Sequence, residues 1–70
     1  MMMTGVIKRL VKNKGFGFIR AASGTDYFFH RSGLDRRLDF EALNEGAHVT
    51  FDESDSGGRG PRATNVDLAA

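Results

Sequence analysis

The sequence predicts an all-β protein, a single five-stranded antiparallel barrel of the Greek-key type. Short segments with alternating or aromatic-rich apolar residues recur along the chain, and glycine-containing turns separate them, as expected of strands. One long charged connection interrupts the series. Five short strands with one long connection are typical of small Greek-key barrels, which leave no sheet edge exposed.

Length and composition exclude several classes of protein. The chain has 70 residues, of which 40% are hydrophobic, and it contains no cysteine. This length holds one domain, over residues 1–70, with a net stability of about 3–5 kcal/mol. Without cysteine there is no disulfide framework, thiolate nucleophile or zinc knuckle. No apolar run approaches the roughly 20 residues of a membrane span, and a signal peptide is not recognisable. We expect a cytoplasmic protein that does not contact membranes.

The first predicted strand covers residues 6–11. Its four aliphatic residues recur at the spacing of a short amphipathic helix. Its three β-branched residues, with Gly5 and Gly15 on either side, favour a strand instead. We predict a strand.

Residues 14–20 predict a second strand with two different faces. In a strand, Phe16, Phe18 and Arg20 share one face because side chains alternate. The other face carries small and aliphatic side chains, those of Gly17, Ile19 and Ala21. That second face suits the interior of a tight barrel, so both phenylalanines are expected on the surface. In the alternative, both phenylalanines are core residues and the strand twists Arg20 outward.

Residues 25–30 are aromatic-rich and follow a Ser-Gly turn, which predicts a third strand. Phe28 and His30 would extend the face of Phe16. Tyr27 and Phe29 are equally apolar and have the opposite parity, so periodicity leaves the two faces of this strand open. The second histidine of the chain lies on another predicted strand, and we expect no metal site.

The second half of the chain supplies the long connection and two more strands. Residues 31–46 are charged and contain three leucines, which predicts a connection with a turn or two of helix. Residues 48–52 alternate polar and apolar side chains, and residues 54–61 have the composition of a mobile loop. Residues 63–68 predict the last strand. Its expected faces are Thr64, Val66 and Leu68 on one side and Asn65 and Asp67 on the other.

Charge is distributed unevenly along the chain. The net charge is only +1, which argues weakly against coating of duplex DNA by charge alone. Residues 1–37 hold eight Lys or Arg and two Asp, whereas residues 38–70 hold two Arg and seven acidic residues. This asymmetry suggests one basic face turned toward a polyanion. Chance clustering of solvated charges explains it equally well.

Exposed phenylalanines beside Lys14 and Arg20 indicate a binding surface, because exposed apolar patches usually mark one. Aromatic rings among cations suit single-stranded nucleic acid. Bases stack on the rings at about 1–3 kcal/mol each, and the cations follow the phosphates.

Four landmarks resemble those of bacterial cold shock proteins. Residues 14–19 (KGFGFI) are similar to the family's first ribonucleoprotein motif, and residues 27–30 (YFFH) to its second. Residues 59–66 (RGPRATNV) resemble the family's ending, and residues 43–46 (LNEG) resemble its turn before a strand. The landmarks occur in the right order over about residues 4–68, with one apparent extra residue in the long connection.

The resemblance implies a cold shock domain, which is an oligonucleotide-binding (OB-fold) barrel that binds single-stranded RNA and DNA by stacking. It also implies an ATP-independent RNA chaperone that melts weak secondary structure, with effects on transcription or translation. The family's stacking positions fall on Phe16, Phe18, Phe28, His30 and, in a loop, Phe40. Its flanking contacts fall on Lys8, Lys14, Asp26 and Arg59. The resemblance favours a monomer, with a strand-swapped dimer as the alternative.

Two positions of the binding surface depart from the family. Arg9 stands where the family has a tryptophan, and Arg31 stands where it commonly has a phenylalanine. Losing two platforms costs about 2–6 kcal/mol if nothing replaces them. A guanidinium can itself stack on a base and attracts phosphates. We therefore predict binding that is weaker and more salt-dependent than in an aromatic-rich relative.

The sequence leaves one other functional class open and argues against a third. In a protein-interaction barrel, the two arginines have eroded nucleic-acid binding and the acidic second half faces a basic partner. An enzyme is not expected, because the sequence shows no paired acid and base, nucleophile–histidine set or metal cluster. Gly15 and Gly17 do not form a phosphate-binding loop, since no Gly-Lys-Ser/Thr follows. We expect no cofactor and no small-molecule substrate.

Overall fold

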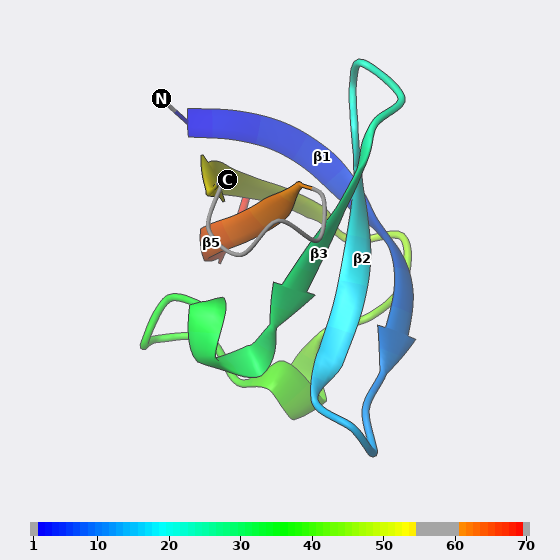
Figure 1. The fold of residues 1–70 in the computed structure, drawn as a ribbon. Coiled ribbons are helices and arrows are strands. Elements are labelled where there is room, and N and C mark those ends of the chain that lie inside the picture. The colour runs from blue at the N-terminus through cyan, green and yellow to red at the C-terminus, as the bar shows by residue number, and fades with distance from the viewer. Residues whose placement is uncertain (1, 55–60, 70) are drawn as a thin grey trace.

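Five strands form a closed barrel in the computed structural model, which describes residues 2–54 and 61–69. The strands are β1 (Met2–Val11), β2 (Phe16–Ala21), β3 (Asp26–His30), β4 (His48–Ser54) and β5 (Arg62–Leu68). Around the barrel they follow the order β1-β2-β3-β5-β4 (Figure 1). The connection from β3 to β4 contains two 3-10 turns, η1 (Arg31–Gly33) and η2 (Phe40–Ala42). The predicted all-β barrel with five strands and one long connection is confirmed.

The seam between β3 and β5 is parallel, and it corrects the prediction of a fully antiparallel barrel. Phe28 is the register partner of Arg62, and a parallel bridge joins Leu34 to Val66. The other seams of the described barrel are antiparallel. The reason is geometric: a closed ring with an odd number of strands cannot reverse direction at every seam.

The long first strand pairs with a different neighbour along each half of its length. β1 begins at Met2, earlier than the predicted residues 6–11, and pairs with β4 over its first half and with β2 over its second. Gly5 and Val6 have register partners on both sides, and Figure 1 shows β1 curving between its two neighbours. A Cβ on Gly5 would lie 2.7 Å from the Arg20 carbonyl oxygen. Glycine therefore permits the close approach of β2 where β1 bends.

The barrel interior is a single apolar core to which every strand contributes. Its most buried large side chains include Phe29 and Val49, at 0% exposure, and Phe51, at 1%. The Tyr27 and Phe51 rings pack with their centroids 5.1 Å apart. The described core residues are Ile7, Ile19, Ala21, Tyr27, Phe29, Phe40, Leu43, Val49, Phe51, Ala63 and Val66.

Strand β5 does not alternate as the sequence pattern predicts. Ala63 and Val66 are buried, whereas Leu68 is 49% exposed. The register with β4 shifts in the middle of the strand, and Asn65 adopts a left-handed backbone with φ of 52°. The irregularity separates the inward positions by three residues instead of two, so the predicted shared face of Thr64, Val66 and Leu68 is wrong.

Most of the predicted mobile loop, residues 54–61, lies outside the described residues, although Ser54 ends β4. Within the described ranges, there is no helix with the length and apolar character needed to cross a membrane.

Candidate nucleic-acid interface

The hairpin of β2 and β3 has one buried face and one outward face. Gly17 and Ile19 of β2, like Tyr27 and Phe29 of β3, are buried, and the residues between them are half-buried or exposed. The predicted faces of β2 are confirmed, and the alternative with both phenylalanines in the core is wrong. The structure also settles β3, where periodicity left the choice open. Its outward residues are Asp26, Phe28 and His30.

Three phenylalanine rings meet on the outward face, and we call them the aromatic surface: Phe16, Phe18 and Phe28. The ring centroids of Phe16 and Phe28 are 5.5 Å apart, and that of Phe18 lies 6.1 Å and 5.9 Å from them. Interplanar angles of 36° to 86° give tilted and edge-to-face contacts. Rings in such contacts support one another without covering each other's faces completely.

Register aligns a row of four side chains across the aromatic surface, which we call the central row. Arg9 of β1 is paired with Phe18 of β2, Phe18 with Phe28 of β3, and Phe28 with Arg62 of β5. The Arg62 guanidinium carbon lies 5.1 Å from the centroid of the Phe28 ring, a cation–π contact. The pair of rings formed by Phe18 and Phe28 therefore has Arg9 on one side and Arg62 on the other.

A β-bulge in β1 places two cations on the outer surface. Ile7 is paired with Ile19, and the next register pair joins Arg9 to Phe18, so Lys8 is the extra residue. Consecutive strand residues normally point to opposite faces, but both Lys8 and Arg9 are exposed. The bulge therefore adds a cation beside the central row without placing one in the core.

His30 lies at the end of the aromatic surface and is the N-cap of η1. It is the register partner of Phe16. The Ser32 backbone N–H donates to Nδ1 of His30 at 3.2 Å, and the Ser32 hydroxyl lies 2.9 Å from the same nitrogen. Because a backbone N–H can only donate, Nδ1 accepts, and the neutral ring carries its proton on Nε2. The ring is thus held in one orientation while remaining exposed.

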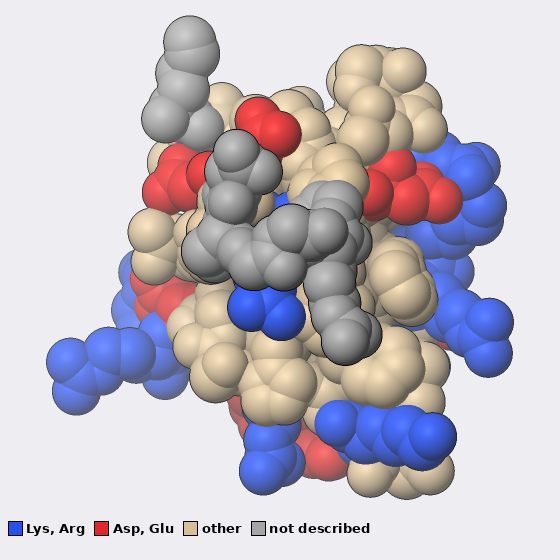
Figure 2. Space-filling model, in the orientation of Figure 1, with Lys and Arg blue, Asp and Glu red and all other residues tan. Residues whose placement is uncertain are grey.

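Several cations beside the aromatic surface form no salt bridge with a described residue, although the charge of Lys8 contributes to lowering the pKa of Asp26. Among the described residues, Lys8, Arg9, Lys14 and Arg31 form no salt bridge. The Arg31 stem lies close to Gly15, since a Cβ added there would be 3.1 Å from Cδ of Arg31. Figure 2 shows Lys and Arg side chains along the right-hand side of the molecule, with acidic side chains against the uppermost of them and uncharged surface beside the others. Unpaired cations remain available for phosphates.

The remaining charges modify the prediction of a single basic face. Nε of Arg20 donates to Asp26 at 2.9 Å on the outer surface. That hydrogen bond is the main cause of a pKa of Asp26 below its ordinary value, so its carboxyl is ionised at neutral pH. Arg37 pairs with Asp35 at 2.9 Å and with Asp67 at 2.6 Å. Arg20 and Arg37 therefore neutralise acidic residues, and they are not among the cations that remain available beside the aromatic surface.

Two predicted site residues do not join the aromatic surface in the structure. Phe40 is only 6% exposed, and its ring packs in the core with its centroid 6.2 Å from that of Phe29. The expectation that Phe40 is a stacking ring on the surface is therefore wrong. In η2 it follows Asp39, whose carboxylate accepts the Glu41 N–H at 3.1 Å, and this turn directs the ring inward. Arg59 lies outside the described residues.

Two residues that sequence reasoning missed lie beside the predicted ones. Arg62 reaches Phe28 through the parallel seam. The Glu45 carboxylate accepts the Leu10 N–H through Oε2 at 3.0 Å, across 35 positions of sequence. Glu45 lines a cavity of about 500 Å³ next to the central row, together with Lys8, Arg9, Phe18 and Asp26. Both residues lie within landmarks of the family resemblance, but their contacts depend on the closure of the barrel and could not be predicted from the local pattern.

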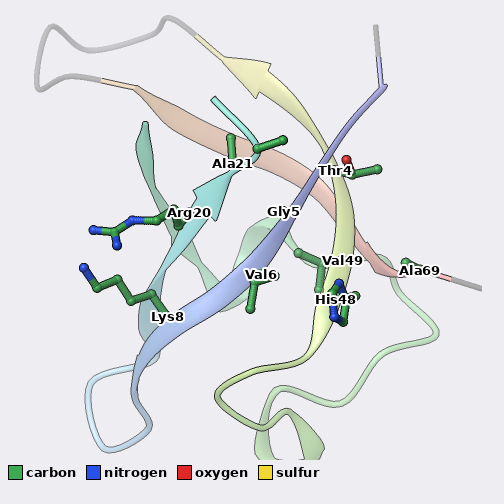
Figure 3. Close-up of a pocket in the computed structure, with 10 residues that line it drawn as sticks. Thr4, Gly5, Val6, Lys8, Arg20, Ala21, His48, Val49 and Ala69 are labelled. Atoms are coloured by element: carbon green, nitrogen blue, oxygen red, sulfur yellow. The ribbon is translucent and has the colours of Figure 1, made fainter. Parts of the chain in front are cut away.

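A second depression of about 630 Å³ lies over the bend of β1. Gly5, Val6 and Val49 are among the small and aliphatic residues that line it. Figure 3 shows Lys8 and Arg20 at one edge, with their charged ends extending in the same direction. Lys8 therefore borders both this depression and the cavity beside the central row.

A closed five-stranded barrel with half-buried rings on its outer surface, beside cations that form no salt bridge with a described residue, defines a small domain of the nucleic-acid-binding class. The family model of the 'Cold-shock' DNA-binding domain matches residues 3–69, and the chain belongs to this family. This is a nucleic-acid-binding family and not a family of enzymes.

Relatives support this assignment over nearly the whole chain. Cold shock protein 2 of Lactiplantibacillus plantarum is 48% identical over 65 residues, which cover 93% of this chain and 96% of that protein. The cold shock-like protein CspE of Bacillus anthracis is 44% identical over 66 residues, covering 94% and 96%. A solved structure described as Drosophila Unr CSD456 matches all of this chain and 27% of that one, with a TM-score of 0.78. At 21% identity it shows the fold alone.

Proposed function

We propose that this protein binds single-stranded RNA and DNA on the aromatic surface and acts as an ATP-independent RNA chaperone. The central row carries the proposal, because it aligns the Phe18 and Phe28 rings between Arg9 and Arg62. Each base stacked on such a ring contributes about 1–3 kcal/mol. The flanking cations attract the phosphates that connect the bases.

Single strands are preferred over duplexes for a simple reason. In a duplex, both faces of each base are already stacked on neighbouring pairs, so the rings of the aromatic surface have no free base face to contact. A protein that binds only the unpaired form shifts the melting equilibrium by mass action and needs no ATP. Weak hairpins in RNA are then opened, and this supports a role in transcription or translation.

Arg9 and Arg31 determine how strong the binding is and how much it depends on salt. Each replaces an aromatic platform with a cation, which stacks less strongly but adds attraction to phosphate. We propose binding that is retained but weaker than in an aromatic-rich relative, and more sensitive to salt. A monomer is sufficient, because the central row is complete within one chain.

Fluorescence anisotropy of a labelled single strand tests the proposal, with an oligonucleotide of about ten nucleotides and the matching duplex as control. Saturable binding is expected for the single strand, weaker binding for the duplex, and weakening of both with salt. Phe16→Ala and Phe28→Ala, each verified by circular dichroism to be folded, should each reduce affinity by about 5- to 100-fold.

The matched control is Leu68→Ala, which removes an exposed apolar side chain from β5 at a position outside the aromatic surface. It should leave affinity unchanged. The proposal fails if the two phenylalanine variants bind as tightly as the unmodified protein, or if no single strand binds at low salt. In the latter case, a stoichiometric protein that co-purifies after nuclease treatment would favour the protein-interaction alternative.

A further inference from the structure

The cavity beside the central row combines an aromatic wall with both signs of charge. It is lined by Phe18, by the cations Lys8 and Arg9, and by the carboxylates of Asp26 and Glu45. It is open to solvent and has a volume of about 500 Å³. A surface that only follows the phosphate backbone needs no carboxylates, since they repel phosphate. Each carboxylate has a structural partner, Arg20 for Asp26 and the Leu10 N–H for Glu45, and beside a stacking ring each can also accept hydrogen bonds from the edge of a base.

Glu45 is fixed in this cavity by the open edge of β1. Strand β4 is paired with β1 only as far as Val6, so the later residues of β1 have no strand on that side. The chain before β4 fills the gap: Gly46 N–H donates to the Ile7 carbonyl at 2.7 Å, and Leu10 N–H donates to Oε2 of Glu45 at 3.0 Å. No donor to Oε1 of Glu45 is found among residues 2–54 and 61–69. This oxygen can accept from a ligand.

The mixed charge of the cavity matches guanine better than the other bases. Guanine presents acceptors at O6 and N7 and donors at N1 and N2. A guanidinium can donate to the acceptors, and a carboxylate can accept from the donors. Uracil offers a single N–H between two carbonyl oxygens, and those oxygens are repelled by carboxylates. Cytosine and adenine each offer an exocyclic amino group but lack guanine's adjacent pair of donors.

We propose that this cavity reads a guanine stacked beside Phe18, with Glu45 accepting from its N1–H and N2–H and Arg9 donating to O6 or N7. Asp26 is a second acceptor at the same cavity, held by Arg20. The inference rests on the proposed single-strand binding and adds a base preference to it. Glu45 is the residue that distinguishes guanine from uracil or thymine.

The first test compares three labelled strands of about ten nucleotides: all thymidine, the same strand with one central deoxyguanosine, and the same strand with deoxyinosine at that position. Inosine keeps O6, N7 and N1–H and lacks the amino group. The single guanine should raise affinity by about 5- to 20-fold over thymidine. Inosine should lose only part of that gain, because it gives up the N2–H contact to Glu45 and keeps the others.

Glu45→Gln tests the assigned residue, because glutamine keeps an oxygen for the Leu10 N–H and removes the negative charge. We expect the guanine preference to fall to about 2-fold or less, while affinity for the all-thymidine strand stays equal or rises. Glu41→Gln is the matched control. It makes the same charge change on an exposed residue outside the cavity, and it should leave the guanine preference intact.

The outcomes separate this inference from the proposed function. If the all-thymidine strand binds and one guanine adds nothing, the guanine site is overturned while single-strand binding stands. A guanine preference that survives Glu45→Gln also overturns the assignment, because the base is then read elsewhere. If Glu45→Gln and Glu41→Gln lose the guanine preference equally, the preference depends on net charge and not on the cavity, and the assignment is overturned. If none of the strands binds, the proposed function itself fails.

Discussion

Both faces of the β2–β3 hairpin carry aromatic residues, but the two faces have different roles. On the inward face, Tyr27 and Phe29 are 5% and 0% exposed and pack in the core. On the outward face, Phe18 and Phe28 are half-buried and flanked by arginines. Aromatic content therefore does not distinguish a core residue from a binding residue in this domain. Parity along the strand and the identity of the cross-strand neighbours do.

The comparison is sharpest for Phe29 and Phe18, which lie on opposite faces of the hairpin. Phe29→Ala should cost about 3–5 kcal/mol of unfolding free energy, because it leaves a cavity in the centre of the core. A domain of this size has only about 3–5 kcal/mol of net stability, so the variant should be largely unfolded. Phe18→Ala loses ring contacts at the surface and should cost no more than about 1–2 kcal/mol. Urea denaturation followed by circular dichroism measures both.

If Phe29→Ala cannot be purified, Phe29→Leu provides the same comparison with a smaller change, about 1–3 kcal/mol. Equal destabilisation by the two alanine substitutions would contradict the division into an inner structural face and an outer binding face.

Gly17 tests how tightly the inner face is packed. A Cβ at this position would lie 2.6 Å from the Arg9 carbonyl oxygen and 2.8 Å from Cε1 of Phe29. Backbone and a buried ring cannot both move away at no cost, so Gly17→Ala should destabilise the fold by about 1–3 kcal/mol. Gly33→Ala is the control, since its nearest neighbour would be the Ala63 carbonyl oxygen at 3.4 Å. A Gly17→Ala variant as stable as the control would show that β1 can shift away from β2.

Arg9 of β1 and Arg31 of η1 can be exchanged for the aromatic residues that the family resemblance implies at these positions. Arg9→Trp with Arg31→Phe should strengthen binding to a single strand and reduce its salt dependence. Removing two cations should lower the slope of log affinity against log salt by about 1.4. Titrations at several salt concentrations give that slope. A slope that does not change would mean that neither arginine contacts phosphate.

The smallest expected effect concerns the exposed pair of Arg20 and Asp26. The pKa of Asp26 lies below its ordinary value of 3.8, chiefly because the carboxylate accepts a hydrogen bond from Arg20. A lowered pKa in the folded state contributes stability above the pKa of the unfolded chain, and this is lost as pH falls through the folded value. The midpoint of thermal unfolding for Asp26→Asn should therefore be slightly below wild type at pH 5–7, and the gap should close below about pH 4.

Asp35→Asn provides a comparison, because a hydrogen bond from Arg37 lowers the pKa of Asp35 in the same way. A gap for Asp26→Asn that stays constant down to pH 2 would show that the variant acts through something other than this pair.

Local patterns in the sequence predicted the parts of the molecule that depend on local geometry. Alternation around Phe16 and Phe18 gave the correct faces of β2, because a strand keeps a period of two wherever its backbone is regular. The same argument failed at Leu68, where the left-handed Asn65 changes the phase of β5. It also gave no answer for Phe28, because both parities of β3 are aromatic.

Other features were beyond prediction because they arise between distant segments. Arg62 meets Phe28 only when the barrel closes, and Glu45 reaches β1 only because β4 leaves part of that strand uncovered. Phe40 was assigned to the surface by resemblance, but a turn in a connection of altered length directs its ring into the core. In each case the sequence contained the residue, and the surroundings that decide its role came from elsewhere in the chain.

The parallel seam between β3 and β5 links nucleic-acid binding to the integrity of the fold. Phe28 belongs to this seam through its register with Arg62 and through its N–H, which donates to the Pro61 carbonyl at 3.1 Å. Phe28 is also one of the three rings of the aromatic surface. If a base stacks on Phe28 as proposed, only the closed barrel can bind it. A single strand at about 100 times its dissociation constant would then add about 2.7 kcal/mol of stability. The protein would resist proteases far longer in the presence of RNA than without it.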